Sequence, residues 1–413
     1  MRPCLNFRRR GFYEVSKIWS TGFKVSALGL GCMRLPTKRL MPLQADVPKS
    51  IKLIKSAVDK GINYIDTAWL YHFGASEKIV GMALQGGYRE KVYLVTKSPL
   101  FLVNKAEDFD KFLNKQLKKM QTDYIDTYLF HSMNKSGLEK LKKYHLIDKM
   151  IEAKKEGKIK YIGFSFHDTL PVFKEVVDFY HWDVVQIQYN YMDTAIQATT
   201  EGLKYAAGKG MAVVIMEPLK GGRLANPPAE AWEVMARSKI KRSPVDWALQ
   251  YLWNLPEISL VLSGMSNLQM LNENCDSADR SGVSSLHEED LNIIDDLIKI
   301  YRKKILVPCT SCKYCLPCPS GVNIPQNFAI LNNVALERSN VRKWLNKRDY
   351  KKMANSPEKL NQAKSNGNAS LCINCGICLE KCPQEIKIPD ELKKVHLILK
   401  KGKKIGDIYE KTS

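Results

Sequence analysis

Short apolar runs alternate with longer amphipathic segments between about residues 24 and 300. The segments 50–61, 105–120 and 137–158 carry apolar residues at helical spacing. Eight runs rich in β-branched and aromatic residues are predicted as strands: 25–31, 63–66, 91–97, 124–131, 159–165, 183–190, 211–216 and 258–264. Eight strand–helix repeats predict an α/β chain built as a (β/α)8 barrel. A doubly wound open sheet is the alternative, but no Gly-x-Gly-x-x-Gly follows the first strand.

The pattern changes after Tyr301, where two groups of cysteines flank a basic stretch with helical spacing from about 326 to 362. A short Lys-rich helix is expected after Asp390. The sequence therefore predicts three parts. They are an N-terminal arm (1–23), a barrel (24–300) and a small, mainly α-helical domain with a basic tail (301–413).

Composition narrows the class of protein. The 413 residues are 45% hydrophobic and 26% charged, which is ordinary for a globular protein and excludes wholesale disorder. No apolar run of about 18 residues occurs, so no transmembrane helix is expected. The basic N-terminus has no apolar segment after it, so we expect no secretory signal and a cytoplasmic location.

Eight of the 11 cysteines form two tight groups. Their close spacing does not suit a disulfide framework, so metal binding in a reducing compartment is favoured. The groups are Cys309, Cys312, Cys315 and Cys318 before a proline, and Cys372, Cys375, Cys378 and Cys382 before another. The second has the CxxCxxCxxxCP spacing of [4Fe–4S] ligation, and the first is one residue shorter. Tetrahedral zinc is the alternative, but four thiolates would not explain two triplets that each end in Cys-Pro.

Polar residues stand where consecutive predicted strands end, which is where barrels place their chemistry. Singly, each has a structural explanation, such as a helix cap or a buried histidine with its partners. Together they indicate proton delivery to a carbonyl oxygen, because a lysine favours a nearby phenolate and a histidine can position the substrate. The residues are Asp66, Lys97, His131 and Ser165 at strand ends, Gln186 within the sixth strand, and Tyr71 five residues beyond Asp66.

At these residues the sequence resembles the aldo-keto reductase family. The matching stretches occur in order over about residues 20–300: GFKVSALGLGCMRLP, GINYIDTAWLYHFGASEKIVGMAL, VYLVTK, DYIDTYLFH, IKYIGFS, VVQIQYN and LSGMSNLQMLNEN. The resemblance implies that Asp66, Tyr71, Lys97 and His131 form the family's catalytic tetrad. It also implies that Tyr71 is the proton donor and that a nicotinamide cofactor donates hydride to the carbonyl carbon.

The resemblance also implies a cofactor site, with two departures. Ser165 and Gln186 would hold the nicotinamide carboxamide, but the family's neighbouring asparagine is Phe166 and its stacking tyrosine is Met216. The segment around the adenosine phosphate would comprise Gly264, Ser266, Glu273 and Asn274. The arginine typical of NADP-selective members is Met270, so either NADP or NAD is expected.

The cysteine region resembles the ferredoxin-type domain fused to a subset of aldo-keto reductases. Its long spacer between the two groups is similar to that of α-helical ferredoxins. This resemblance implies two [4Fe–4S] clusters with crossed ligands. One cluster would take Cys309, Cys312, Cys315 and Cys382, and the other would take Cys372, Cys375, Cys378 and Cys318.

The net charge of the chain indicates what kind of partner it could bind. The formal net charge is +21, and residues 301–413 hold 22 Lys and Arg against 9 Asp and Glu. Two clusters would offset part of this excess, and the rest favours an acidic redox partner, a ferredoxin or a flavodoxin. We see no helix-turn-helix or RNA-stacking motif, so neither nucleic acid nor a membrane is an expected partner.

Two functions remain from the sequence. The first is an NAD(P)-dependent oxidoreductase acting on a small carbonyl or alcohol, coupled to electron transfer through the clusters. The alternative is an electron-transfer module that docks the acidic carrier and has little carbonyl reductase activity. The intact tetrad favours the first, whereas Phe166 and Met216 favour the second.

Overall fold

The computed structural model describes residues 25–38, 41–336, 340–356 and 366–409. The predicted N-terminal arm, with Cys4, lies outside the described residues. Contacts divide the chain into two compact units. The first comprises the residues up to Leu219 together with Val245–His287, and the second comprises Lys220–Pro244 together with Glu288–Ser413. The domain limits expected from the sequence stay predictions.

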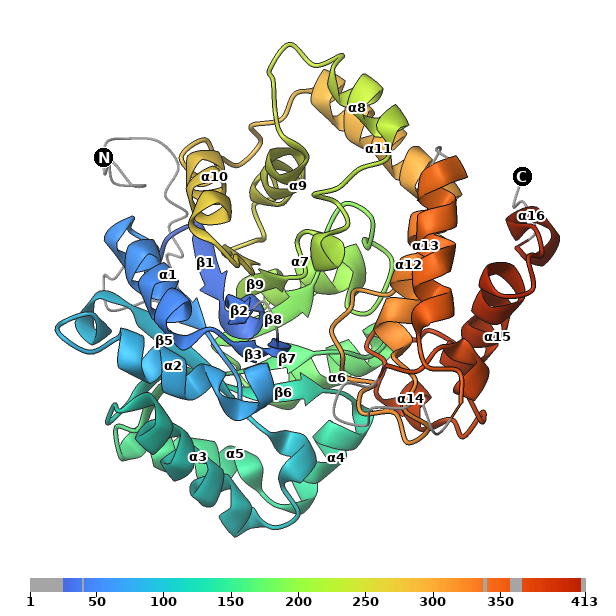
Figure 1. Cartoon of the computed structure of the whole chain (residues 1–413). Coiled ribbons are helices and arrows are strands. Elements are labelled where there is room, and N and C mark those ends of the chain that lie inside the picture. The colour runs from blue at the N-terminus through green and yellow to red at the C-terminus, as the bar shows by residue number, and fades with distance from the viewer. Residues whose placement is uncertain (1–24, 39–40, 337–339, 357–365, 410–413) are drawn as a thin grey trace. The chain divides into compact units, whose positions relative to one another are not determined.

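The first unit contains a closed barrel of eight parallel strands, which confirms the predicted fold class (Figure 1). Neighbouring strands pair in the order β1-β10-β9-β8-β7-β6-β5-β4, and β4 closes the ring on β1. All eight predicted strands are present: β1 Leu28–Gly31, β4 Tyr64–Asp66, β5 Tyr93–Ser98, β6 Ile125–Met133, β7 Ile159–Phe166, β8 Val184–Gln188, β9 Ala212–Met216 and β10 Leu260–Ser263. A small hairpin that the sequence did not predict is formed by β2 (Thr37–Lys38) and β3 (Met41–Ala45).

Helices surround these strands (Figure 1). They are α1 Val47–Asp59, α2 Ser76–Ala83, α3 Ala106–Met120, α4 Lys135–Lys143, α5 Leu146–Lys155, α6 Leu170–Phe179, α7 Thr199–Gly208, α9 Pro244–Trp253 and α10 Leu268–Ala278. The helical segment expected at 137–158 is two helices, because His145 takes a left-handed conformation with φ 49° between them. Gly61 follows α1 with φ 95°, a conformation that glycine adopts without the steric cost of a side chain.

Strand alternation separates two apolar layers. Side chains that point into the barrel form one cluster, including Tyr64, Val95, Leu129 and Val214. The opposite faces of the strands pack against the helices in a larger cluster. Because inward positions recur every second residue, the last inward residue of each strand lies at the carboxyl-terminal rim. The polar residues predicted from the sequence occupy that rim.

The second unit is mainly helical around its own apolar cluster. Its helices are α8 Ala229–Met235, α11 Glu288–Lys304, α12 Ile324–Leu336, α13 Asn340–Lys352, α14 Ile377–Glu380, α15 Ile388–Leu399 and α16 Ile405–Ile408. The basic stretch expected to be helical, about 326–362, covers most of α12 and all of α13, and its end from residue 357 lies outside the described residues. Within the described ranges, no helix is both long and apolar enough to cross a membrane.

Candidate functional site

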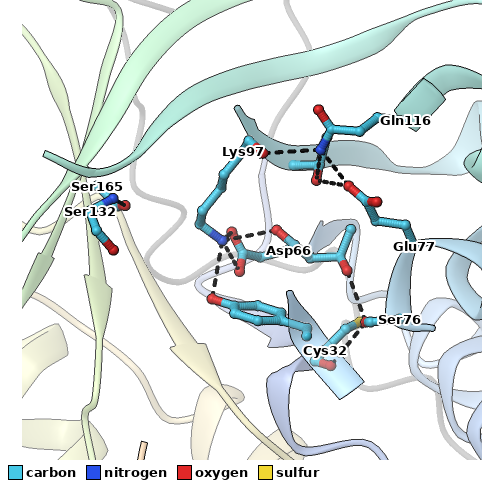
Figure 2. A network of polar contacts seen from close by, with 11 residues as sticks. Cys32, Asp66, Ser76, Glu77, Lys97, Gln116, Ser132 and Ser165 are labelled. Carbon is cyan, nitrogen blue, oxygen red and sulfur yellow. Dashed lines mark hydrogen bonds and ion pairs between the residues drawn. The ribbon is translucent and has the colours of Figure 1, made fainter. Parts of the chain in front are cut away.

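A buried ion pair lies at the centre of the barrel rim (Figure 2). Asp66 ends β4 and Lys97 lies near the end of β5, on neighbouring strands. The Lys97 ammonium donates to both carboxylate oxygens of Asp66 at 2.7 Å and to the backbone oxygen of Thr67 at 3.0 Å. The two side chains are almost fully buried. Their contact compensates two charges that would each be costly alone.

Tyr71 completes this arrangement from the short 3₁₀ turn Tyr71–Gly74. The Lys97 ammonium donates to the Tyr71 phenol oxygen at 3.4 Å. The rings of Tyr71 and His131, which lies in β6, are edge-on with centroids 6.1 Å apart. The structure therefore brings Asp66, Tyr71, Lys97 and His131 together.

Burial dominates the electrostatics of the rim. It lowers the pKa of Lys97, although the nearby Asp66 carboxylate opposes that shift. It also lowers the pKa of His131 well below the usual value, and the positive charge of Lys97 acts in the same direction. His131 is therefore a neutral imidazole at neutral pH. In that form it can donate a hydrogen bond through one ring nitrogen.

A second polar network, which the sequence analysis missed, supports the end of β5 (Figure 2). Glu77 of α2 is fully buried, and its carboxylate accepts from Thr96 at 2.8 Å, from Lys119 at 3.1 Å and from Gln116. Gln116 of α3 also donates to the backbone oxygen of Lys97 at 3.0 Å. The signal in the sequence is a glutamate at a core-facing position of an amphipathic helix.

The two residues expected at the carboxamide differ in their surroundings. The Ser165 hydroxyl accepts the backbone N–H of Ser132 at 2.8 Å, so it fixes the chain next to His131 (Figure 2). Gln186 of β8 is buried and donates to Asp66, while its side-chain oxygen has no hydrogen-bond partner in the described part of the chain. A buried acceptor of this kind suits the amide N–H2 of a carboxamide.

The family's asparagine is not replaced by an equivalent donor. Phe166 is fully buried and packs on Phe173 of α6, with ring centroids 4.9 Å apart. Met216 ends β9 and is partly exposed.

Another histidine at the rim was missed as well. His167 lies two residues beyond Ser165, so strand alternation places both on the inward side. The Nδ1 atom of His167 lies 3.2 Å from the Gln197 side-chain oxygen, and Gln197 donates to Gln188 at 3.3 Å. Gln188 in turn donates to Asp193 at 3.0 Å. Burial lowers the pKa of His167 to about 4.

The predicted adenosine segment lies around the start of α10. Asn274 is buried and donates to the Ser263 hydroxyl at 2.7 Å. Glu273 is exposed and accepts from Gln269 at 2.9 Å, while Ser266 donates to the sulfur of Met270 at 3.4 Å. Gly264 lies against the side chain of Arg34, because a Cβ at Gly264 would come within 3.2 Å of the Arg34 Cβ.

The cysteines of the second unit line two hollows. The first, of about 310 Å³, is lined by Cys309, Cys312, Cys315 and Cys382. The second, of about 370 Å³, is lined by Cys315, Cys318, Cys372, Cys375 and Cys378. The first hollow thus combines three cysteines of the first group with Cys382 of the second, and the second hollow combines three cysteines of the second group with Cys315 and Cys318 of the first. No described cysteine forms a disulfide.

The thiols suit iron–sulfur clusters by their chemistry and their grouping. Burial raises the pKa of Cys309 and Cys382, and it raises that of Cys378 to about 11. Thiols held near one another in apolar surroundings become thiolates when a metal takes the proton's place. In the described part of the chain, no three His, Cys, Asp or Glu side chains are grouped to hold a single metal ion.

Comparison with known proteins assigns the barrel. The aldo/keto reductase family model matches residues 27–299, about two thirds of the chain. The chain belongs to the aldo/keto reductase family. Residues 308–388 match a 4Fe-4S dicluster domain. The predicted fusion of an aldo/keto reductase with a ferredoxin-type domain is therefore confirmed.

Individual aldo/keto reductases and oxidoreductases agree with this assignment. An uncharacterized oxidoreductase of Bacillus subtilis is 28% identical over 322 residues, covering 69% of this chain and 98% of its own length. The L-galactose dehydrogenase of Arabidopsis thaliana is 26% identical, covering 69% of this chain and 94% of its own. The holo form of an aldo-keto reductase from Bacillus halodurans superposes with a TM-score of 0.56 at 26% identity, covering 67% and 93%. The chain is thus an aldo/keto reductase-like oxidoreductase with a 4Fe-4S domain.

Proposed function

We propose that this aldo/keto reductase is an NAD(P)-dependent oxidoreductase that interconverts a small carbonyl compound and its alcohol, with Tyr71 as proton donor. The observation that carries the proposal is the Lys97 ammonium, which contacts both Asp66 and the Tyr71 phenol within the barrel rim. The nicotinamide, when bound, supplies or accepts the hydride.

The chain's own residues manage the proton. Tyr71 accepts a hydrogen bond from Lys97, which places the Lys97 charge next to the phenol oxygen that would give up its proton. When that proton moves to the developing alkoxide, the Lys97 charge stabilises the phenolate that remains. Burial lowers the pKa of Lys97, and the Asp66 carboxylate opposes this loss of charge. Neutral His131 donates a hydrogen bond to the same substrate oxygen.

Gln186 supports nicotinamide binding here, because its buried oxygen has no partner among the described residues. Ser165 stays a candidate for the same carboxamide, with its hydroxyl positioned by the backbone N–H of Ser132. Gly264, Ser266, Glu273 and Asn274 stay candidates for the adenosine end, for either NADP or NAD.

The test is Tyr71→Phe, assayed with NADH and NADPH against small aldehydes and ketones. We expect kcat to fall by about 10²–10⁴-fold, the usual contribution of a positioned acid. Tyr64→Phe is the matched control, because the buried Tyr64 hydroxyl has no hydrogen-bond partner in the described part of the chain. Retained turnover in Tyr71→Phe would refute the assignment of the proton donor.

We further propose that the cysteine domain holds two [4Fe–4S] clusters with crossed ligands and couples the reductase to electron transfer. The composition of the two hollows supports the crossing, since Cys382 lines the first and Cys318 the second. Clusters, when bound, carry single electrons. Free thiols in these numbers favour a reducing cytoplasm.

Paired variants test the crossing by electron paramagnetic resonance. Cys318→Ser and Cys375→Ser should damage the same cluster signal, whereas Cys382→Ser and Cys312→Ser should damage the other. The crossing fails if Cys318→Ser and Cys312→Ser remove the same signal.

The alternative function is an electron-transfer module with little carbonyl chemistry. Phe166 favours it, because this buried ring leaves no donor where the family has an asparagine. Reduction of the clusters without turnover of any carbonyl would support this alternative.

A further inference from the structure

The second hollow opens onto an exposed apolar patch. We define the patch as Ile373, Ile377 and Leu379, which are 70%, 44% and 44% exposed. Cys375 lies among them in the sequence and is itself exposed. Ile373, Cys375 and Ile377 also line the second hollow, so the patch and the hollow form one continuous surface.

The two hollows differ in the exposure of their cysteines. In the first hollow Cys309 is 8% exposed and Cys312 and Cys382 are partly exposed, whereas the second hollow contains the exposed Cys375. A group held at the second hollow is therefore better placed to exchange electrons with another molecule. Three large aliphatic side chains gathered at such an opening indicate a surface that another molecule covers.

Charge indicates what covers it. Residues 301–413 hold 22 Lys and Arg against 9 Asp and Glu. Six of those cations lie in α13, which has a single aspartate. A second copy of this domain would bring two strongly basic surfaces together, whereas an acidic protein would be attracted to it.

We propose that Ile373, Ile377 and Leu379 form the docking surface for an acidic one-electron carrier protein, which exchanges electrons at the second hollow. This proposal rests on the proposed function of the cysteine domain. Each encounter moves one electron between the carrier's redox group and the group at the second hollow, and no bond forms or breaks. Long-range charge speeds the encounter, and the apolar patch brings the two redox groups close.

A triple variant, Ile373→Gln, Ile377→Gln and Leu379→Gln, tests the patch in the full chain without changing its charge. The control is Val341→Gln with Trp344→Gln on α13, since these apolar side chains are 68% and 58% exposed in the same unit. The probe is a reduced acidic plant-type [2Fe–2S] ferredoxin, mixed with the oxidised protein in stopped flow. Reduced methyl viologen serves as a donor that needs no docking surface.

We expect the triple variant to lower the second-order rate constant with ferredoxin by about tenfold or more. The rate with viologen, the iron content and the carbonyl turnover should stay within about twofold of the wild type. The control variant should behave like the wild type with both donors. Raising the salt concentration should slow the ferredoxin reaction in wild type and control alike.

Four results would overturn the proposal. Two concern the rate constant with ferredoxin: it is unchanged in the triple variant, or it falls in the α13 control instead. The other two are that the wild type exchanges no electrons with ferredoxin, or that the wild type is a dimer and the triple variant is not. Failure of viologen to reduce the iron-loaded wild type would refute the proposed function of the domain, and the docking surface with it. That result is distinguishable, because it involves the non-docking donor.

Discussion

The barrel rim and the cysteine domain differ in what compensates their buried ionisable groups. At the rim, the charged groups are compensated by the protein itself, as Lys97 contacts Asp66, Thr67 and Tyr71. In the cysteine domain, eight thiols line two hollows and form no disulfide. The rim is preorganised before any ligand binds, whereas we expect the cysteine domain to depend on bound groups for part of its stability.

Removal of iron should give the largest effect, because it acts on one region alone. We expect chelation under oxidising conditions to increase hydrogen exchange in α12 and α15 by about a thousandfold or more, since bound metal is folding free energy in such domains. Exchange in β4 to β7 should change little. The measurement is hydrogen exchange by mass spectrometry before and after chelation. If α12 and α15 are as well protected from exchange in the iron-free protein as in the iron-loaded protein, the cysteine domain does not depend on bound iron for its stability.

The variant Lys97→Met perturbs the barrel instead of the cysteine domain, because it leaves Asp66 buried without its cation. Breaking a buried pair in this way should destabilise the barrel by about 3–5 kcal/mol. Urea titration followed by hydrogen exchange of barrel peptides measures the change, and protection of α12 and α15 serves as the internal reference. The double variant Lys97→Met with Asp66→Asn is the control. It should regain part of the stability and none of the activity. If the single and double variants are equally stable, the Asp66 carboxylate does not depend on Lys97 for compensation of its charge.

The sequence was sufficient for the barrel and its central residues. Strand alternation and the ends of consecutive strands were enough to predict that Asp66, Lys97 and His131 share one rim. The support from Glu77 and Gln116 was not predictable in the same way, because it joins two helices to a strand through side chains far apart in the chain. His167 could have been predicted from the sequence, since it lies two residues after Ser165 and so on the same face of the strand.

The cysteine spacing predicted two triplets but not which fourth cysteine belongs to which triplet. Local spacing constrains only neighbours, whereas the approach of Cys382 to the first hollow depends on how α12 and α15 pack. The placement of Lys220–Pro244 with the second unit was also beyond sequence patterns. It depends on contacts such as the ion pair of Arg242 with Asp290 at 2.8 Å.

Substitution of one glycine in each region should change stability by a smaller amount. A Cβ at Gly163 in β7 would lie 2.1 Å from the backbone oxygen of Val184 on β8, so Gly163→Ala should cost about 1–3 kcal/mol through overpacking. Gly376 precedes α14 as its N-cap residue, with φ 77°, and has room for a Cβ, so Gly376→Ala should cost about 1 kcal/mol through backbone strain alone. Thermal unfolding of the iron-loaded variants separates the two. A larger loss in Gly376→Ala would reverse the expected order.

The smallest expected effect is the contribution of His167 to the pH dependence of barrel stability. The pKa of His167 is lowered to about 4 by burial, and Lys97 acts in the same direction. The unfolded chain therefore binds the proton first, so stability is complete above about pH 6.5 and declines as the pH falls from there towards 4. Between pH 7.5 and 5.5 this loss should be about 1 kcal/mol for His167. His167→Asn keeps a donor near Gln197 but cannot titrate, so its urea midpoint should fall less over that interval. An unchanged slope would show that the pKa of His167 is not lowered in the folded barrel.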